Sequence, residues 1–151
     1  MSVLLNAKQS LGKSTELLVT SMLLDEGREV CVPMVDDHGI DLLVKTREYI
    51  AGDRTKPENY DFQEIQIKSV TDGGLFVFTC KEARPNYWFI FYVKEKDVFW
   101  LINSIELING GISYVNKTGK HIGHYTAPLS TKKKINDKFA YLIVKDFNKI
   151  P

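Results

Sequence analysis

One nine-residue stretch, FQEIQIKSV from Phe62 to Val70, constrains the fold of this chain most. Its isoleucines alternate with polar residues, which predicts a β-strand because successive strand side chains point to opposite faces. One face would carry two isoleucines, and the other would carry Glu64, Gln66 and Lys68. Such a polar row is either solvent-exposed surface or part of a functional site, and the rest of the sequence has to decide which.

The elements around this strand predict an α/β domain with a mixed central sheet. An apolar stripe at helical spacing predicts a helix from about residue 10 to residue 26, and Gly27 follows as its cap. Apolar runs predict strands at 29–35, 40–45, 75–80, 86–93 and 97–102, a short helix at 105–109, and weaker strands near 112–115 and 140–145. The run at 86–93 is apolar almost throughout, which indicates a strand buried on both faces. The polar stretch 46–61 is long for a loop in a compact domain, and loops of that length are usually functional or mobile.

The composition is that of a single globular domain spanning residues 1–151, with 44% apolar residues. Cys31 and Cys80 lie in apolar runs, which predicts buried free thiols in a reducing compartment. No apolar stretch approaches the roughly 18 residues that a membrane span needs. The N-terminal stretch has no long apolar segment of the signal-peptide kind. We therefore expect a cytoplasmic protein.

The charge is distributed unevenly along the chain. Residues 111–151 hold eight lysines and two acidic residues, net +6, whereas residues 1–110 are net −5. A basic C-terminal extension is compatible with polyanion binding and equally with a solvated tail. The histidines of HIGHY, residues 121–125, are interpreted as loop or as DNA-contacting surface, because no cysteine or acidic cluster accompanies them. The other candidate contacts to a nucleic-acid backbone are cations and a histidine: His38, Arg47, Arg54, Lys56, Lys132, Lys133 and Lys134.

Four side chains from three predicted elements are candidates for one site. If strands 40–45 and 62–70 are neighbours, Asp41 shares a face with Gln66 and Lys68, and Glu16 lies at the margin of the helix's apolar stripe. Carboxylate, amide and main-chain oxygens suit Mg²⁺. A lysine beside them could hold an attacking water or offset charge on a phosphate. The other face, with Ile40, Leu42 and Val44, is expected to be core.

The segments VPMVDDHGIDLLV and FQEIQIKS, with Glu16 on an upstream helix, resemble the PD-(D/E)XK nuclease superfamily over roughly residues 10–102. They look most like its D…QxK members, such as some intron-encoded homing endonucleases. The resemblance implies a restriction-endonuclease-like αβββαβ core and Mg²⁺-dependent, or Mn²⁺-dependent, hydrolysis of DNA, with RNA as another substrate. It assigns metal binding to Asp41, Gln66, the Ile67 carbonyl and Glu16, and the catalytic lysine to Lys68. By analogy it also implies a homodimer or a higher homo-oligomer.

Two departures from that pattern keep an alternative open. Gln66 stands where the family has an acid, so one negative charge is missing unless Glu16 or Glu64 compensates. The Pro-Asp dipeptide is absent, because Asp41 follows Ile40. A catalytically inactive nuclease-fold module that binds nucleic acid or a protein partner therefore remains the alternative interpretation.

Overall fold

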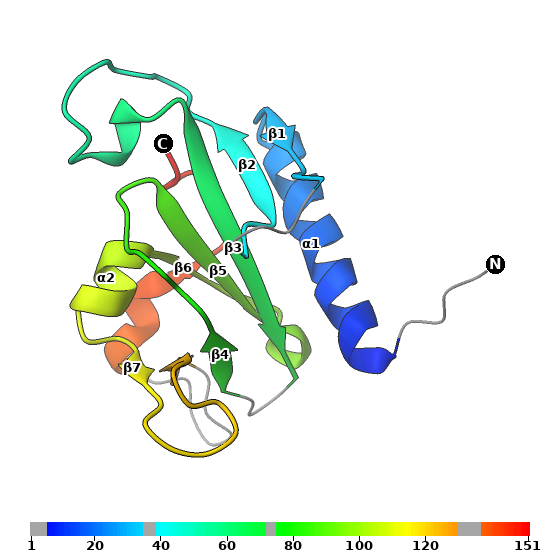
Figure 1. Cartoon of the computed structure of the whole chain (residues 1–151). Helices are drawn as coiled ribbons and strands as arrows, with labels where there is room; N and C mark the ends of the chain where they lie inside the picture. The colour runs from blue at the N-terminus through cyan, green and yellow to red at the C-terminus, as the bar shows by residue number, and fades with distance from the viewer. Residues whose placement is uncertain (1–5, 35–38, 72–74, 130–136) are drawn as a thin grey trace.

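The structure is a computed structural model, and it describes residues 6–34, 39–71, 75–129 and 137–151 (Figure 1). The helices are α1 (Ala7–Asp25) and α2 (Ser104–Asn109), with short 3-10 helices η1 (Pro57–Asn59), η2 (Lys94–Lys96) and η3 (Asp137–Leu142). The strands are β1 (Val30–Cys31), β2 (Leu42–Lys45), β3 (Phe62–Val70), β4 (Phe76–Phe78), β5 (Tyr87–Val93), β6 (Val98–Asn103), β7 (Tyr114–Val115), β8 (Tyr125–Ala127) and β9 (Ile143–Val144).

The strands form two sheets. The larger has the order β1-β2-β3-β5-β6-β9, in which β3 and β5 are parallel and all other neighbours are antiparallel. The smaller has the order β4-β8-β7 and is antiparallel throughout. The predicted mixed α/β fold is therefore confirmed. In place of the second helix of the αβββαβ pattern, the described part of the crossover from β3 to β5 contains β4, which belongs to the smaller sheet.

Helix α1 begins three residues earlier than the apolar stripe predicts, because Asn6 and Gln9 form a capping box. The Asn6 side chain accepts from the Gln9 main-chain N–H at 3.0 Å, and the Gln9 side chain accepts from the Asn6 N–H at 3.1 Å. The helix ends just before Gly27, whose φ of 75° is in the left-handed region that favours glycine. The predicted C-terminal boundary of the helix is thus confirmed.

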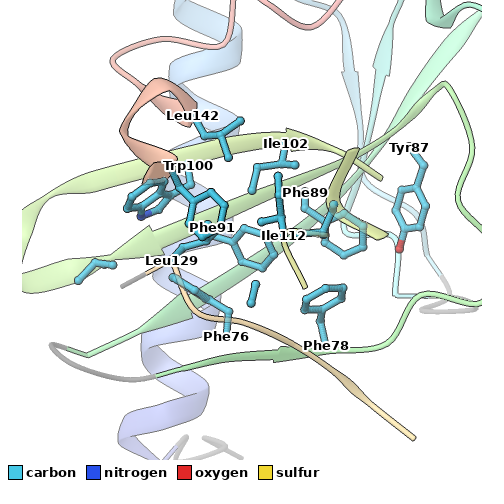
Figure 2. Packing of buried hydrophobic residues seen from close by; sticks show 14 residues of the cluster. Phe76, Phe78, Tyr87, Phe89, Phe91, Trp100, Ile102, Ile112, Leu129 and Leu142 are labelled. Atoms are coloured by element: carbon cyan, nitrogen blue, oxygen red, sulfur yellow. The ribbon is translucent and has the colours of Figure 1, made fainter. Parts of the chain in front are cut away.

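The large sheet is buried on both faces. Val19 and Leu23 of α1 pack on one face, against a cluster that includes Ile65 and Ile67. The smaller sheet, α2 and η3 cover the opposite face, where Figure 2 shows a largely aromatic cluster. Strand β5 serves both sides: its odd-numbered residues, from Tyr87 to Val93, belong to the aromatic cluster, and its even-numbered residues to the cluster under α1. The prediction of a strand buried on both faces is confirmed.

Strands β2 and β1 each differ from the sequence-based expectations in one detail. Strand β2 begins at Leu42, and Ile40 before it packs against the aromatic cluster, not with Leu42 and Val44. Cys31 is exposed because β1 lies at the edge of the sheet, so the prediction of a buried thiol was wrong for this residue. Among the described residues, no helix is long and apolar enough to cross a membrane.

Candidate active site at the N-terminal end of β2

Asp41 lies immediately before β2 and is bound to β3 through both its backbone and its side chain. Its main-chain N–H donates to the Ile65 carbonyl at 2.8 Å, which extends the pairing of the two strands. Its Oδ2 accepts from the Ile67 N–H at 2.6 Å. The carboxylate therefore accepts the hydrogen bond that a main-chain carbonyl would accept if the pairing of the two strands continued, and β3 holds the carboxylate in place.

The register of β2 and β3 places three predicted site residues on one face. Leu42 is opposite Ile65, so continuation of the antiparallel register sets Asp41 opposite Gln66. Lys68 lies two residues farther along β3 and shares that face. The predicted neighbourhood of the two strands is confirmed, and it brings Asp41, Gln66 and Lys68 together on the face that the smaller sheet partly covers.

The Gln66 amide is enclosed, with only 2% of the residue exposed. The Tyr87 hydroxyl donates to its Oε1 at 2.9 Å. On its other side lies Gly39, where an added Cβ would come within 2.7 Å of Gln66 Nε2. Gly39 also has a φ of 73°, so both its conformation and the space beside it favour glycine. Tyr87 and Gly39 together fix the position of the amide.

Tyr87 is a donor because its phenol stays protonated. Burial raises the pKa of Tyr87, the charges of Cys80, Glu64 and Asp41 add to this effect, and Arg84 opposes it. In Figure 2 Tyr87 lies at one end of the aromatic cluster, beyond Phe89. The hydroxyl is thus a fixed neutral donor to the Gln66 amide at the end of the aromatic cluster.

Glu64, the third polar residue of the row, forms an ion pair with Arg84. Burial disfavours the Arg84 charge, but the hydrogen bond and the charge of Glu64 outweigh it and raise the pKa of Arg84. The guanidinium carbon also lies 5.0 Å from the centre of the Tyr87 ring. The negative charge of Glu64 is therefore offset by Arg84, which makes this carboxylate a poor substitute for the acid that Gln66 replaces.

Glu16 lies on α1, which packs on the opposite face of the sheet from Gln66 and Lys68. Its Oε2 is 3.1 Å from Lys13 Nζ. The parts of α1 on either side of Glu16 show where it lies along β3. The α1 residues that precede Glu16 in the sequence line a cavity of about 660 Å³ together with Ser69, Val70 and Thr71. Val19, which follows Glu16, packs in the cluster that contains Ile65. These contacts place Glu16 near the level of Ile67 along β3 but on the α1 side of the sheet, where its ion-pair partner is Lys13, so the predicted convergence of Glu16 with the other three residues is not shown.

The oxygens around Asp41 are compatible with a hard divalent cation. The Ile67 N–H points to Asp41, so the Ile67 carbonyl points to the same edge of β3. The Asp41 carboxylate and the Gln66 amide oxygen have more lone-pair sites than the hydrogen bonds from Ile67 and Tyr87 occupy. No three His, Cys, Asp or Glu side chains gather into a metal-binding group within the described residues. The donor set thus fits Mg²⁺, which takes few protein ligands and keeps several waters.

The predicted nucleic-acid contacts that the structure describes, Arg47, Arg54 and Lys56, lie in the loop that follows the C-terminal end of β2, whereas Asp41 precedes its N-terminal end. Arg47 donates to the Asn148 carbonyl and to Asn148 Oδ1, and it lies 3.9 Å from Glu26. Arg54 lies over the Tyr60 ring at 5.1 Å, and Lys56 is exposed in the same loop. His38, Lys132, Lys133 and Lys134 lie outside the described residues.

Sequence reasoning missed Tyr87, Gly39 and Arg84. Tyr87 belongs to an apolar run that predicted core, and the pattern could not reveal that one hydroxyl in it reaches Gln66. The signal for Gly39 was its place in a predicted turn two residues before Asp41, where a left-handed residue is common.

Comparisons with known proteins show which fold this chain resembles. No family model matches the sequence, and no curated protein matches it. Among solved structures, one described as the structure of a bacterial homing endonuclease, I-Ssp6803I, matches with a TM-score of 0.52 and 16% sequence identity. The match covers 87% of this chain and 84% of the other. This chain has a nuclease-like fold. At this identity the likeness concerns the fold, and the chemistry has to be argued from the residues.

Proposed function

We propose that this chain is a metal-dependent endonuclease of the PD-(D/E)XK type that hydrolyses phosphodiester bonds in DNA. The observation that carries the proposal is the 2.6 Å hydrogen bond from the Ile67 N–H to Asp41 Oδ2. It holds a carboxylate opposite an amide oxygen and on the same face as a lysine, immediately before the first residue of β2. The nuclease-like fold supports this interpretation.

Asp41, Gln66 and the Ile67 carbonyl would hold Mg²⁺, or Mn²⁺, and Glu16 would contribute from α1. The bound cation supplies positive charge that stabilises a phosphate undergoing attack. The Lys68 ammonium would hold the attacking water in line and offset negative charge that develops on the phosphate. Tyr87 and Gly39 would keep the Gln66 oxygen in position, because neither leaves the amide room to rotate.

The substrate and the assembly follow from the same proposal. Double-stranded DNA is the proposed substrate, and RNA is the competing one. Two copies of a small nuclease would each cut one strand, so a homodimer or a higher homo-oligomer is the proposed assembly. The substrate and the oligomeric state can each be measured independently of the chemistry of the site.

A specific observation favours the alternative of an inactive nuclease-fold module that binds nucleic acid or a protein partner. Gln66 is neutral and almost fully buried, and Glu64 is already paired with Arg84. The negative charge for a cation at this site would then have to come from Asp41, with Glu16 as the other proposed contributor. A site with so little negative charge holds a cation weakly, and fold alone does not imply activity.

Cleavage of supercoiled DNA with Mg²⁺ or Mn²⁺ separates the two functions. Asp41→Asn keeps an oxygen for the Ile67 N–H and removes the charge, so it tests chemistry with little change in folding. Lys68→Gln removes the proposed ammonium, and Lys45→Gln is the matched control, because Lys45 is an exposed lysine of β2 paired with Glu29. Metal-dependent cleavage lost in the first two variants and kept in the control supports the endonuclease. DNA binding without cleavage under either metal supports the inactive module.

A further inference from the structure

The loop that joins β7 to β8, residues 116–124, is an ordered hairpin tip. The Asn116 N–H donates to the His124 carbonyl at 2.8 Å, and the Gly123 N–H donates to the Asn116 carbonyl at 2.9 Å. The Asn116 side chain makes two hydrogen bonds with the Thr126 hydroxyl group, at 2.8 and 3.1 Å. An ordered loop loses little conformational freedom when it binds a partner.

The charge of this hairpin is of one sign. Lys117, Lys120 and His121 are exposed, and the sequence contains no acidic residue between Glu106 and Asp137. Neither lysine forms an ion pair with any residue in the described parts of the chain. Arg47 and Arg54 of the 46–61 loop, in contrast, are engaged by Asn148 and Tyr60. Among the described residues, therefore, the two hairpin lysines are cations without an ion-pair partner.

The position of the hairpin relates it to the candidate site. Tyr125 at the base of the hairpin pairs with Phe78 of β4, and Phe78 packs on Phe89 with their ring centres 4.9 Å apart. Phe89 is the β5 neighbour of Gln66. The small sheet thus places the hairpin on the same face of the large sheet as Asp41, Gln66 and Lys68.

We infer that this hairpin is a contact surface for the phosphate backbone of duplex DNA, with Lys117 and Lys120 as the contacting cations. A two-stranded β-ribbon fits the major groove of B-form DNA, and lysines at its tip reach the phosphates that border the groove. The inference rests on the proposed function for its choice of nucleic acid, and it adds the surface that would hold the substrate on the catalytic face.

The test is binding of a labelled duplex DNA of mixed sequence in EDTA, so that cleavage does not interfere. Lys117→Gln with Lys120→Gln should weaken binding roughly tenfold or more at about 0.1 M salt, and lower the slope of log affinity against log salt by about 1.8. The matched control is Lys8→Gln with Lys149→Gln, two exposed lysines of segments that pack on the opposite face. Lys117→Arg with Lys120→Arg should restore binding, because the charge is kept.

Equal weakening in the hairpin pair and the control pair, or no weakening in either, overturns the inference, as does a wild-type chain that does not bind duplex DNA. Circular dichroism of each variant checks that the fold is kept. Failure of the proposed function gives a different result: a chain that binds DNA through this hairpin in EDTA but cuts nothing with Mg²⁺ or Mn²⁺ loses the nuclease proposal and keeps the hairpin assignment.

Discussion

The Tyr87 hydroxyl donates a 2.9 Å hydrogen bond to Oε1 of Gln66, across the parallel pairing of β5 with β3. Both groups are buried, so neither has water as a substitute partner. The bond links the aromatic core to the one amide that the site would use as a ligand. Changes at Tyr87 should therefore affect both the stability of the fold and the properties of the site.

Tyr87→Phe removes this donor and leaves a buried amide oxygen with one partner fewer. We expect a loss of about 1–2 kcal/mol in the free energy of unfolding, measured by urea denaturation. Tyr141→Phe is the matched control, because Tyr141 donates to Glu106 at 2.8 Å on the exposed surface. Its cost should stay within about 0.5 kcal/mol. Equal costs would show that the bond between Tyr87 and Gln66 adds nothing to stability.

The raised pKa of Tyr87 predicts a loss of stability in alkali. An ordinary tyrosine has a pKa of about 10. Above that pH the unfolded chain releases the phenol proton while the folded chain keeps it, so unfolding becomes easier as pH rises towards the folded pKa. Below about pH 10 the stabilising contribution is fully present. Denaturation at several alkaline pH values should show a shallower decline for Tyr87→Phe than for the wild type; parallel declines would contradict the assignment.

Gly39→Ala and Gly27→Ala separate two effects of an added Cβ. Both glycines have positive φ, 73° and 75°, so either alanine carries backbone strain of about 1–2 kcal/mol. At Gly27 nothing lies within 4 Å of the new Cβ, whereas at Gly39 it meets the Gln66 amide. We expect Gly39→Ala to lose more stability and most of the cleavage, and Gly27→Ala to keep cleavage. Similar activity in both variants would remove Gly39 from the site.

The sequence correctly predicted which residues of β3 share a face, because strand side chains alternate between the two faces with a period of two. Ile65 and Ile67 point to the helix, and Gln66 and Lys68 point away from it, as that alternation requires. The pairing with β2 was also predictable, since the two strands are joined by one loop. Local patterns were sufficient wherever the partner is near in the sequence.

The sequence could not predict that Tyr87 contacts Gln66 or that β4 belongs to the smaller sheet. An all-apolar strand such as β5 contains no alternation, so nothing marks which of its residues lies beside Gln66. The register of two parallel strands is fixed by packing between distant segments, not by a turn. In the same way, the apolar run of β4 predicts a strand but not which sheet it joins.

Glu64→Gln tests whether Glu64 supplies charge to the site. The variant should lose about 1 kcal/mol of stability or less, because the pair with Arg84 is only partly buried. Mg²⁺ affinity, measured by calorimetry, should stay near that of the wild type. Asp41→Asn should instead lose detectable Mg²⁺ binding. A loss as large in Glu64→Gln would make Glu64 the compensating carboxylate after all.

Gln66→Glu tests the site without an activity assay. The new carboxyl would be almost fully buried, which raises its pKa above the ordinary value of about 4.3. The unfolded chain then releases the proton first, so stability falls as pH rises from about 4 through the folded pKa. We expect denaturation at about pH 8 to show a much less stable variant than at about pH 5.

A divalent cation should reverse that loss if Gln66 faces the metal. A cation that binds the folded state alone adds about 2.7 kcal/mol at a hundredfold excess over its dissociation constant. The control is Gln63→Glu, because Gln63 is also buried in β3 but lies on the opposite face and bonds to Thr46 and Trp88. Mg²⁺ should raise the melting temperature of Gln66→Glu at about pH 8 and leave that of Gln63→Glu unchanged. An equal rise in both variants, or in neither, would show that the position of Gln66 is not a metal ligand.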